Sequence, residues 1–512
     1  MFSYFEDDTD TLFRCLLVNR VWFEKAAAIL WRSPFCQPRK PSRKLIETFI
    51  SFLDGRSKTI LADNGIFPIP SSSRKSPHTF VYSPFVRNLC YRRLYESACS
   101  FIFGDVENRK RKTWTEEKRC LLLVEELCKF LIRNCPCIDT LSYDTADVNF
   151  YGTDVYMKLP MMPTAKNLFA RLRKLDCGGK YEKGELMHAI SMHCKNLDTL
   201  ELNFYEFDMF NSDSRLELKK MSGLICSQKS LHNLIIRGGK FKYLSDFMKP
   251  LETQKNSLSR VEFHRVYFRD SGPLEALASC LNLEILTFRD CENLKNETFL
   301  PLASVAFTKL RTFTLKNRHQ QSFDSLAQMI KNTRGSLREI RFRRRNIKNM
   351  VISEVPDIPL NVIETISKAC PNLHTFECHI EKQSMLYFQL ILNSCALEKL
   401  YVSIESECKE FFRSRVPSLL PSSLHHLTIS TMNRFTSDDL DRFLKLCSVP
   451  LTTFQLTTSP FVDDQCLKVI VKFARRRRTL KYVTLPRCSL VTGEAIRKAR
   501  EVISFIEKVG EE

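Results

Sequence analysis

Residues 280–288 read CLNLEILTF, and residues 283–288 of this stretch follow the pattern L-x-x-L-x-L, in which L is any apolar residue. The alternation in its second half predicts a short strand with one buried face. The pattern recurs along the chain, with its first position at Ile138, Leu172, Leu197, Leu231, Leu258, Leu283, Leu310, Leu337, Leu373, Leu397, Leu424, Leu451 and Leu480. A weaker copy begins at Val86. So many ordered copies indicate a repeat protein.

The spacing of the copies predicts the architecture. Most successive first positions are 24–29 residues apart, and three intervals are 34, 34 and 36. This period is typical of leucine-rich repeats. Residues 121–131 and 362–369 show apolar residues at helical spacing between strands. One strand and one helix cannot close a core, so stacked units are expected to form an α/β leucine-rich-repeat solenoid, a horseshoe with strands on its concave side. The last helix, near 493–509, is expected to cap it.

The 20 cysteines follow the repeat rather than a metal motif. Cys135, Cys194, Cys280 and Cys370 each stand three residues before the first apolar residue of a unit. We expect them to be buried thiols, because free cysteine behaves as a small apolar residue. The sequence contains no paired Cys-x-x-Cys, HExxH, phosphate-binding glycine loop or G-x-S-x-G element. It therefore predicts no metal, no cofactor and no catalytic residue, and a protein that is not an enzyme.

The charge balance indicates acidic partners. The chain has 512 residues, with 78 Lys and Arg against 58 Asp and Glu, a formal net charge of +20. No apolar run has the length of a membrane span, and the first residues, MFSYFEDDTDTLF, are acidic where a signal peptide is basic. These features predict an intracellular protein, cytoplasmic or nuclear, that does not interact with membranes.

Upstream of the repeats, residues 12–22 read LFRCLLVNRVW and residues 28–35 read AILWRSPF. This segment resembles the second half of an F-box, and the chain as a whole resembles the fungal-type F-box and leucine-rich-repeat proteins. The helix with a Leu-Pro-x-Glu start that opens an F-box is missing, so either the assigned start is wrong or this copy has lost that helix. The residues that match apolar positions of the family are Leu12, Leu16, Val18, Trp22, Leu30 and Trp31.

The resemblance implies a partner and a domain order. F-boxes bind the Skp-type adaptor of a cullin-RING ubiquitin ligase, so the six matching residues are the expected adaptor-binding residues. The expected domains are a partial, α-helical F-box-like segment at 1–35, a helix plus Pro/Ser-rich linker at 36–85, and the solenoid at 86–512. Alternatively, Trp22 and Trp31 only pack an N-terminal cap for the solenoid.

Basic residues recur on the predicted concave face. The third, fifth and seventh positions of a unit point away from the core. The seventh position of six consecutive units is basic or histidine, and one fifth position adds an arginine, giving Arg237, His264, Arg289, Lys316, Arg341, Arg343 and His379 as candidate substrate-binding residues. Such a row suits an acidic or phosphorylated peptide. The alternative is that these side chains are solvated or paired with acids such as Glu262.

A run of four arginines, 475–478, follows a predicted helix. It favours a solvated helix end, where cations complement the helix dipole, over a nuclear-localisation signal.

The sequence thus favours a substrate-recognition subunit of an SCF-type ubiquitin ligase. The alternative is a leucine-rich-repeat scaffold that binds acidic protein or nucleic acid without a ligase. Nucleic acid is the less favoured ligand, because no aromatic stacking motif accompanies the basic residues.

Overall fold

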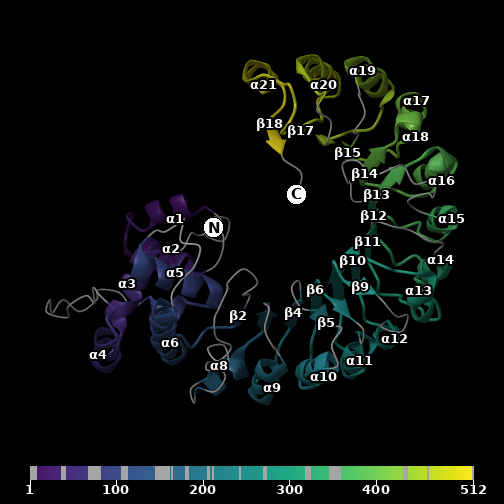
Figure 1. Cartoon of the computed structure of the whole chain (residues 1–512). Helices are drawn as coiled ribbons and strands as arrows, with labels where there is room; N and C mark the ends of the chain where they lie inside the picture. Colours follow the sequence, from purple (N-terminus) through teal and green to yellow (C-terminus); the bar gives the residue numbers. More distant parts are fainter. Residues whose placement is uncertain are drawn as a thin grey trace. The chain divides into compact units, whose positions relative to one another are not determined.

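The structure is a computed structural model of the whole chain. It describes residues 8–35, 42–66, 82–104, 114–143, 162, 165–178, 184–204, 208–209, 213–241, 244–268, 274–317, 324–344, 359–430, 436–457 and 461–509. The chain divides into two compact units, Met1–Leu258 and Ser259–Glu512. In each unit, parallel strands are lined on one side by helices (Figure 1). The predicted α/β class with a parallel sheet is confirmed.

The first unit begins with helices and continues into repeats. Its helices are α1 (Thr9–Cys15), α2 (Arg20–Leu30), α3 (Arg43–Phe52), α4 (Gly55–Asp63), α5 (Tyr91–Phe103), α6 (Trp114–Asn134), α8 (Ala165–Arg171), α9 (Gly184–His193), α10 (Asp213–Cys226) and α11 (Leu244–Met248), with 3-10 turns at Ser83–Phe85 and Lys249–Gln254. The helix predicted within 36–85 is α3, and α4 is an additional helix. The Pro/Ser-rich linker falls largely on residues 67–81, outside the described residues.

Five strands of the first unit pair in parallel, in the order β1 (Asn88–Cys90), β2 (Thr140–Ser142), β3 (Lys174–Cys177), β4 (Thr199–Asn203) and β6 (Asn233–Arg237). The weak copy at Val86 corresponds to β1. Two short strands, β5 (Asp208–Met209) and β7 (Lys240–Phe241), pair separately. Equivalent positions of successive units are register partners, as with Leu200 and Leu234. The repeat period therefore aligns the apolar positions from strand to strand.

The second unit consists of repeats throughout. Its parallel strands follow the order β8 (Arg260–His264), β10 (Ile285–Cys291), β11 (Thr312–Asn317), β12 (Glu339–Arg344), β13 (Thr375–Ile380), β14 (Lys399–Ile404), β15 (His426–Ser430), β16 (Thr453–Thr457), β17 (Tyr482–Pro486) and β18 (Phe505–Val509), and β9 (Tyr267–Phe268) lies outside this order. Its helices are α12 (Glu275–Ala278), α13 (Asn296–Ala303), α14 (Asp324–Asn332), α15 (Leu360–Ala369), α16 (Met385–Ser394), α17 (Lys409–Ser414), α18 (Val416–Leu419), α19 (Ser437–Leu446), α20 (Asp464–Arg477) and α21 (Gly493–Ala499), with 3-10 turns at Lys382–Ser384 and Ser406–Cys408. Within this unit the strands follow the inner side of an arc and the helices the outer side (Figure 1).

Aromatic rings connect neighbouring strands in the core of the second unit. Phe288 stacks on Phe263 with ring centroids 5.3 Å apart, and it lies 6.4 Å from Phe313. Phe313 in turn contacts Phe342 edge-on at 6.2 Å. These four rings come from four successive strands, β8 and β10–β12. Stacking one repeat on the next therefore buries apolar area that a single repeat would leave in water.

The predicted capping helix near 493–509 is wrong in its second half. Helix α21 ends at Ala499, and the chain then forms strand β18, which pairs with β17. Ile503 and Ile506 are buried and supply apolar contacts of the kind made by the first and fourth positions of a repeat. The sixth position is Lys508, whose amino group donates to the carbonyls of Ser489 and Val491. Strand β18 therefore covers the end of the core. At its sixth position it carries the cation of Lys508, where the other units have an apolar side chain.

Polar side chains of one repeat complete the backbone of the repeat before it. Gln228 donates to the Cys194 carbonyl at 2.8 Å and accepts from the Leu197 amide at 3.0 Å. Gln254 repeats this one unit later, donating to the Gln228 carbonyl at 2.9 Å and accepting from the Leu231 amide at 3.0 Å. In the second unit, hydroxyls donate to the carbonyl of the preceding unit's first residue, at 2.7, 2.8 and 2.9 Å for Ser336, Ser423 and Thr479.

We predict that Gln254→Leu will destabilise the first unit. Gln254 is 2% exposed, and the change leaves the Leu231 amide and the Gln228 carbonyl without this partner in the interior. Two unsatisfied buried groups cost about 2–4 kcal/mol of unfolding free energy. Urea denaturation, with hydrogen exchange at Leu231, measures the effect. The matched control is Gln328→Leu on the exposed side of α14, which should change stability by less than about 0.5 kcal/mol. Equal changes in the two variants would contradict the prediction.

Candidate binding surfaces

Helices α1 and α2 hold the predicted adaptor residues. The Asp8 carboxylate accepts from the Thr11 amide at 2.9 Å and starts α1, and the Asn19 side chain accepts from the Trp22 amide at 2.9 Å and starts α2. The two helices share a small apolar core, formed by Leu12, Cys15, Ala26 and Leu30 with Leu16, Ile29 and Trp31 packed against it. The caps and this core fix which side chains of the pair face water.

The six predicted adaptor residues separate into two groups. Leu12 is fully buried and Leu30 is 9% exposed, so both hold the helix pair together. Leu16 and Trp31 are partly buried against the same core. Val18 and Trp22 face outward, with 58% and 37% of their surface exposed. Assigning Leu12 and Leu30 to an adaptor contact is therefore wrong, because residues with almost no accessible surface cannot bind a partner.

Trp31 belongs to the interior of the first unit. Its ring stacks on Tyr82 at 4.3 Å and meets Phe49 of α3 edge-on at 5.6 Å. The alternative reading, in which the tryptophans pack internally, therefore holds for Trp31. Trp22 stands on the exposed side of α2 instead.

Three exposed apolar residues near Val18 were not among the sequence predictions. Phe13, Leu17 and Val21 are 64%, 81% and 65% exposed. Their i, i+4 spacing is visible in the sequence, but only the packing of α1 against α2 shows that they face water. Together with Val18 and Trp22 they form what we call the N-terminal apolar patch.

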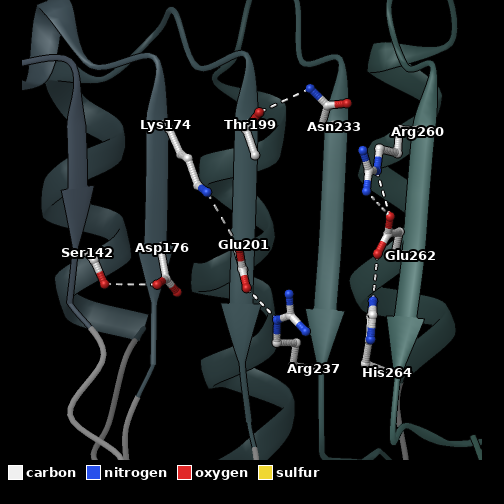
Figure 2. Close-up of polar contacts among 10 residues, drawn as sticks. All are labelled: Ser142, Lys174, Asp176, Thr199, Glu201, Asn233, Arg237, Arg260, Glu262 and His264. Carbon is white, nitrogen blue, oxygen red and sulfur yellow. Dashed lines mark hydrogen bonds and ion pairs between the residues drawn. The ribbon is translucent and has the colours of Figure 1, made fainter. Parts of the chain in front are cut away.

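The strand face of the first unit is a network of paired charges (Figure 2). Glu201 of β4 forms ion pairs with Lys174 of β3, at 4.0 Å, and with Arg237 of β6. The neighbouring contacts join register partners: Ser142 donates to Asp176 at 2.9 Å, and Asn233 donates to Thr199 at 3.1 Å. Arg237, a predicted substrate residue, is thus already neutralised by an acid on the adjacent strand.

His264 of the second unit is also paired. Its Nε2 lies 2.6 Å from a carboxylate oxygen of Glu262, and Arg260 binds the other oxygen (Figure 2). The hydrogen bond from His264 and the contact with Arg260 lower the pKa of Glu262 to about 2, although burial opposes the shift. His264 and Glu262 are only 6% and 7% exposed. This group is therefore a closed polar cluster, as the pairing alternative expected.

Arg341 stands in a larger cluster on β12–β15. It pairs with Glu339 on its own strand and lies 3.7 Å from Glu377 on β13. Its guanidinium also lies over the Tyr401 ring, 5.0 Å from the centroid. Tyr401 contacts His426 of β15 with ring centroids 5.0 Å apart. Arg341 is thus held by two acids and an aromatic ring.

Arg289, Lys316 and Arg343 occupy equivalent positions on three successive strands. Arg289 of β10 is the register partner of Lys316 of β11, which is the partner of Arg343 of β12. Arg289 is exposed and forms no ion pair with another described side chain, whereas only the backbone of Arg343 is described. The fifth positions of β10 and β11 carry Thr287 and Thr314, so no carboxylate is available there. We call these three residues the basic row.

His379 lies two residues beyond the described pairing of β12 with β13. It lies on β13, partly buried, and pairs with Ser403 of β14. The β12–β13 pairing is described as far as Arg341 and Glu377. Of the seven candidates, the structure therefore brings together three and places Arg237, His264 and Arg341 in internal pairs.

Two of the four arginines in the run 475–478, at the end of α20, donate to carbonyls at the end of the helix before it, α19. Arg476 donates to the Leu444 carbonyl, and Arg477 donates to the Cys447 carbonyl at 2.8 Å. Both carbonyls lie at the carboxyl end of α19, where cations satisfy otherwise unpaired oxygens. The helix-end interpretation of this run is therefore supported.

The cysteines before the strands are buried, as predicted. Cys135, Cys194, Cys280 and Cys370 are at most 3% exposed. Burial raises the pKa of the Cys135, Cys194 and Cys370 thiols to about 12. No group of three or more potential metal ligands occurs among the described residues. Within the same ranges, the structure contains no helix with the length and apolar content of a membrane span.

Comparisons with known proteins give no family assignment. No protein-family model matches the chain, and no curated protein sequence matches it significantly. Function is therefore argued from the surfaces themselves.

His426 should make the stability of the second unit depend on pH. Burial lowers the pKa of His426 to about 4, and the positive charge of Lys399 adds to the shift. The unfolded chain, with the ordinary value of 6.5, binds a proton first, so this residue's contribution is complete above pH 6.5 and is lost as the pH falls towards 4. Urea denaturation at several pH values should show a shallower loss for His426→Gln than for the unchanged chain. Parallel profiles would contradict the prediction.

Proposed function

We propose that this chain is a substrate-recognition subunit of an SCF-type ubiquitin ligase. In this proposal the N-terminal apolar patch binds the Skp-type adaptor, and the repeats form a leucine-rich-repeat solenoid whose strand face binds the substrate. The chain performs no bond chemistry. It accelerates ubiquitin transfer by holding substrate and ligase close together. Cytoplasm or nucleus is the compartment where such a complex acts.

The observation that carries the proposal is the N-terminal apolar patch. Five apolar residues between positions 13 and 22 are at least 37% exposed, on a helix pair whose core is formed by Leu12, Cys15, Ala26 and Leu30. Single exposed apolar side chains are normal on a surface, but five of them within ten residues of one helix pair are typical of a protein–protein interface. The segment is also the one that resembles an F-box. A protein adaptor is therefore the partner that accounts best for it.

The substrate side of the proposal rests on the basic row. Parallel strands lie about 4.8 Å apart, so three adjacent cations span about 10 Å, the size of a short acidic or phosphorylated stretch. The paired arginines elsewhere on the strand face would have to lose an existing carboxylate to bind an anion. Arg289 forms no ion pair with another described side chain, so it would not have to give up such a carboxylate. The basic row, rather than the full set of seven predicted residues, is therefore the proposed anion contact.

A scaffold without a ligase is the second candidate. The net charge of +20 favours an acidic partner whether or not an adaptor binds. The two candidates share the basic row and differ in the apolar patch. Adaptor binding therefore separates them.

We predict that Leu17→Asp/Val18→Asp will abolish capture of the Skp-type adaptor. Two carboxylates in an apolar contact would have to be desolvated, and a loss of tenfold or more in affinity corresponds to about 1.4 kcal/mol or more. Co-purification and calorimetry with the purified adaptor measure the effect. Leu386→Asp is the control, since Leu386 is a 72% exposed leucine on α16 of the second unit. Circular dichroism should show both variants folded. Undiminished binding by the double variant, or no binding by the unchanged chain, would refute the ligase proposal.

The second prediction of this proposal concerns charge. Arg289→Glu/Arg343→Glu should remove binding to a peptide library that carries one phosphoserine, and binding by the unchanged chain should weaken as salt is raised. Screening acts beyond about 8 Å at physiological ionic strength, so contacts on an exposed row are salt-sensitive. Arg475→Glu/Arg478→Glu, at two exposed arginines at the end of α20, changes the net charge by the same amount and serves as the control. Peptide binding that is unaffected by salt and by the double variant would place the substrate contact elsewhere.

A further inference from the structure

Two cysteines on adjacent helices of the first unit lie unusually close together. The Sγ atoms of Cys99 on α5 and Cys120 on α6 are 3.1 Å apart, and both residues are thiols. A disulfide bond is about 2.05 Å long, so the sulfurs need to approach by only about 1 Å to bond.

Solvent has access to only one of the two cysteines. Cys120 is fully buried, whereas Cys99 is only partly buried. A small oxidant therefore reaches Cys99 first, while Cys120 stays protected beside it. A partly accessible thiol next to a protected one is the arrangement of a reactive cysteine and its resolving cysteine.

Other titratable groups share this space. Tyr95 lies one helical turn before Cys99, and Glu117, 2% exposed, lies one turn before Cys120. Burial, with the neighbouring Cys99 and Cys120 groups next in effect, raises the pKa of Tyr95. The pair thus sits in a polar cluster between α5 and α6, unlike the cysteines before the strands, which pack among apolar residues.

We propose that Cys99 and Cys120 are a reversible oxidation site, which closes to a disulfide when a peroxide-class oxidant reaches Cys99. The Cys99 sulfur attacks one peroxide oxygen, the O–O bond breaks, and a sulfenic acid and one water result. The Cys120 sulfur then attacks the sulfenic sulfur, the S–O bond breaks, and its oxygen leaves as a second water. The two thiols lose two electrons, and the peroxide gains them.

The bond would fasten α5 to α6. These helices follow β1 and precede β2, which are paired strands. In a reducing compartment glutathione and thioredoxin systems reopen such bonds, so the link would persist only while oxidant is present. The site is independent of the proposed ligase function.

The test uses the full-length reduced protein and hydrogen peroxide. After brief exposure and alkylation, non-reducing peptide mapping should recover the peptides of Cys99 and Cys120 linked to each other. The product should have lost two hydrogen atoms in mass, and dithiothreitol should restore both thiols. In Cys120→Ser, Cys99 should be trapped as a sulfenic acid by a dimedone probe. Cys395→Ser is the control: Cys395 is 3% exposed and its thiol donates to the Cys370 carbonyl at 3.5 Å, so the Cys99–Cys120 link should form unchanged.

Two results would overturn the proposal. One is recovery of Cys99 and Cys120 as separate thiols from protein in which the exposed Cys226 and Cys488 have been oxidised. The other is formation of the same link at an equal rate in urea, since the fold would then contribute nothing to the reaction. If Cys120→Ser does not fold, mapping of the unchanged chain alone decides between these outcomes.

Discussion

A repeat of one strand and one helix cannot bury its own apolar surface. The first, fourth and sixth positions of each unit point into a space that only the neighbouring units fill, and the ring contacts from Phe263 through Phe342 show how they do so. Parallel pairing in a constant register follows, because any slip would turn apolar side chains towards water. The remaining features depend on this register. It brings Glu201 beside Arg237 and sets Arg289 beside Lys316.

The same register explains why many charged residues of the strand face are paired, although the sequence alone does not show their partners. Acids and bases occupy neighbouring columns of adjacent strands, so most find an opposite charge within reach. Glu262, Glu201 and Glu377 are nearly covered and each contacts a cation. The fifth positions of the units are also less accessible to solvent than residues on an exposed sheet face. Thr287 and Thr314, which occupy this position on β10 and β11, are only 4% and 5% exposed. Where Thr287 replaces the acid on β10, Arg289 is exposed and forms no ion pair with another described side chain.

How far the sequence predicts this structure differs between features. Strands β2–β4, β6, β8 and β10–β17 were predictable because their apolar alternation repeats, whereas the short strands β5, β7 and β9 lie outside the repeated pattern. Strand β18 was missed because Lys508 stands where an apolar residue was expected. On the N-terminal helices, Leu12 and Phe13 are adjacent and both apolar, and only the packing of α1 against α2 shows that one is core and the other surface. The pairing of Arg237 with Glu201, 36 residues apart, requires the register between strands, which a single sequence does not supply.

Five side-chain hydrogen bonds between repeats share a direction. The side chains of Gln228, Gln254, Ser336, Ser423 and Thr479 all satisfy backbone groups of an earlier repeat. During synthesis, which runs from the amino end, the newest of these repeats therefore leaves the ribosome with polar backbone groups that are hydrogen-bonded to water until its successor folds. Such a chain grows with one incomplete end, and that end moves forward with translation. A ribosome that stalls between Gln228 and Gln254 would expose this end for as long as the stall lasts, which gives the cell's folding and degradation factors a recognisable state.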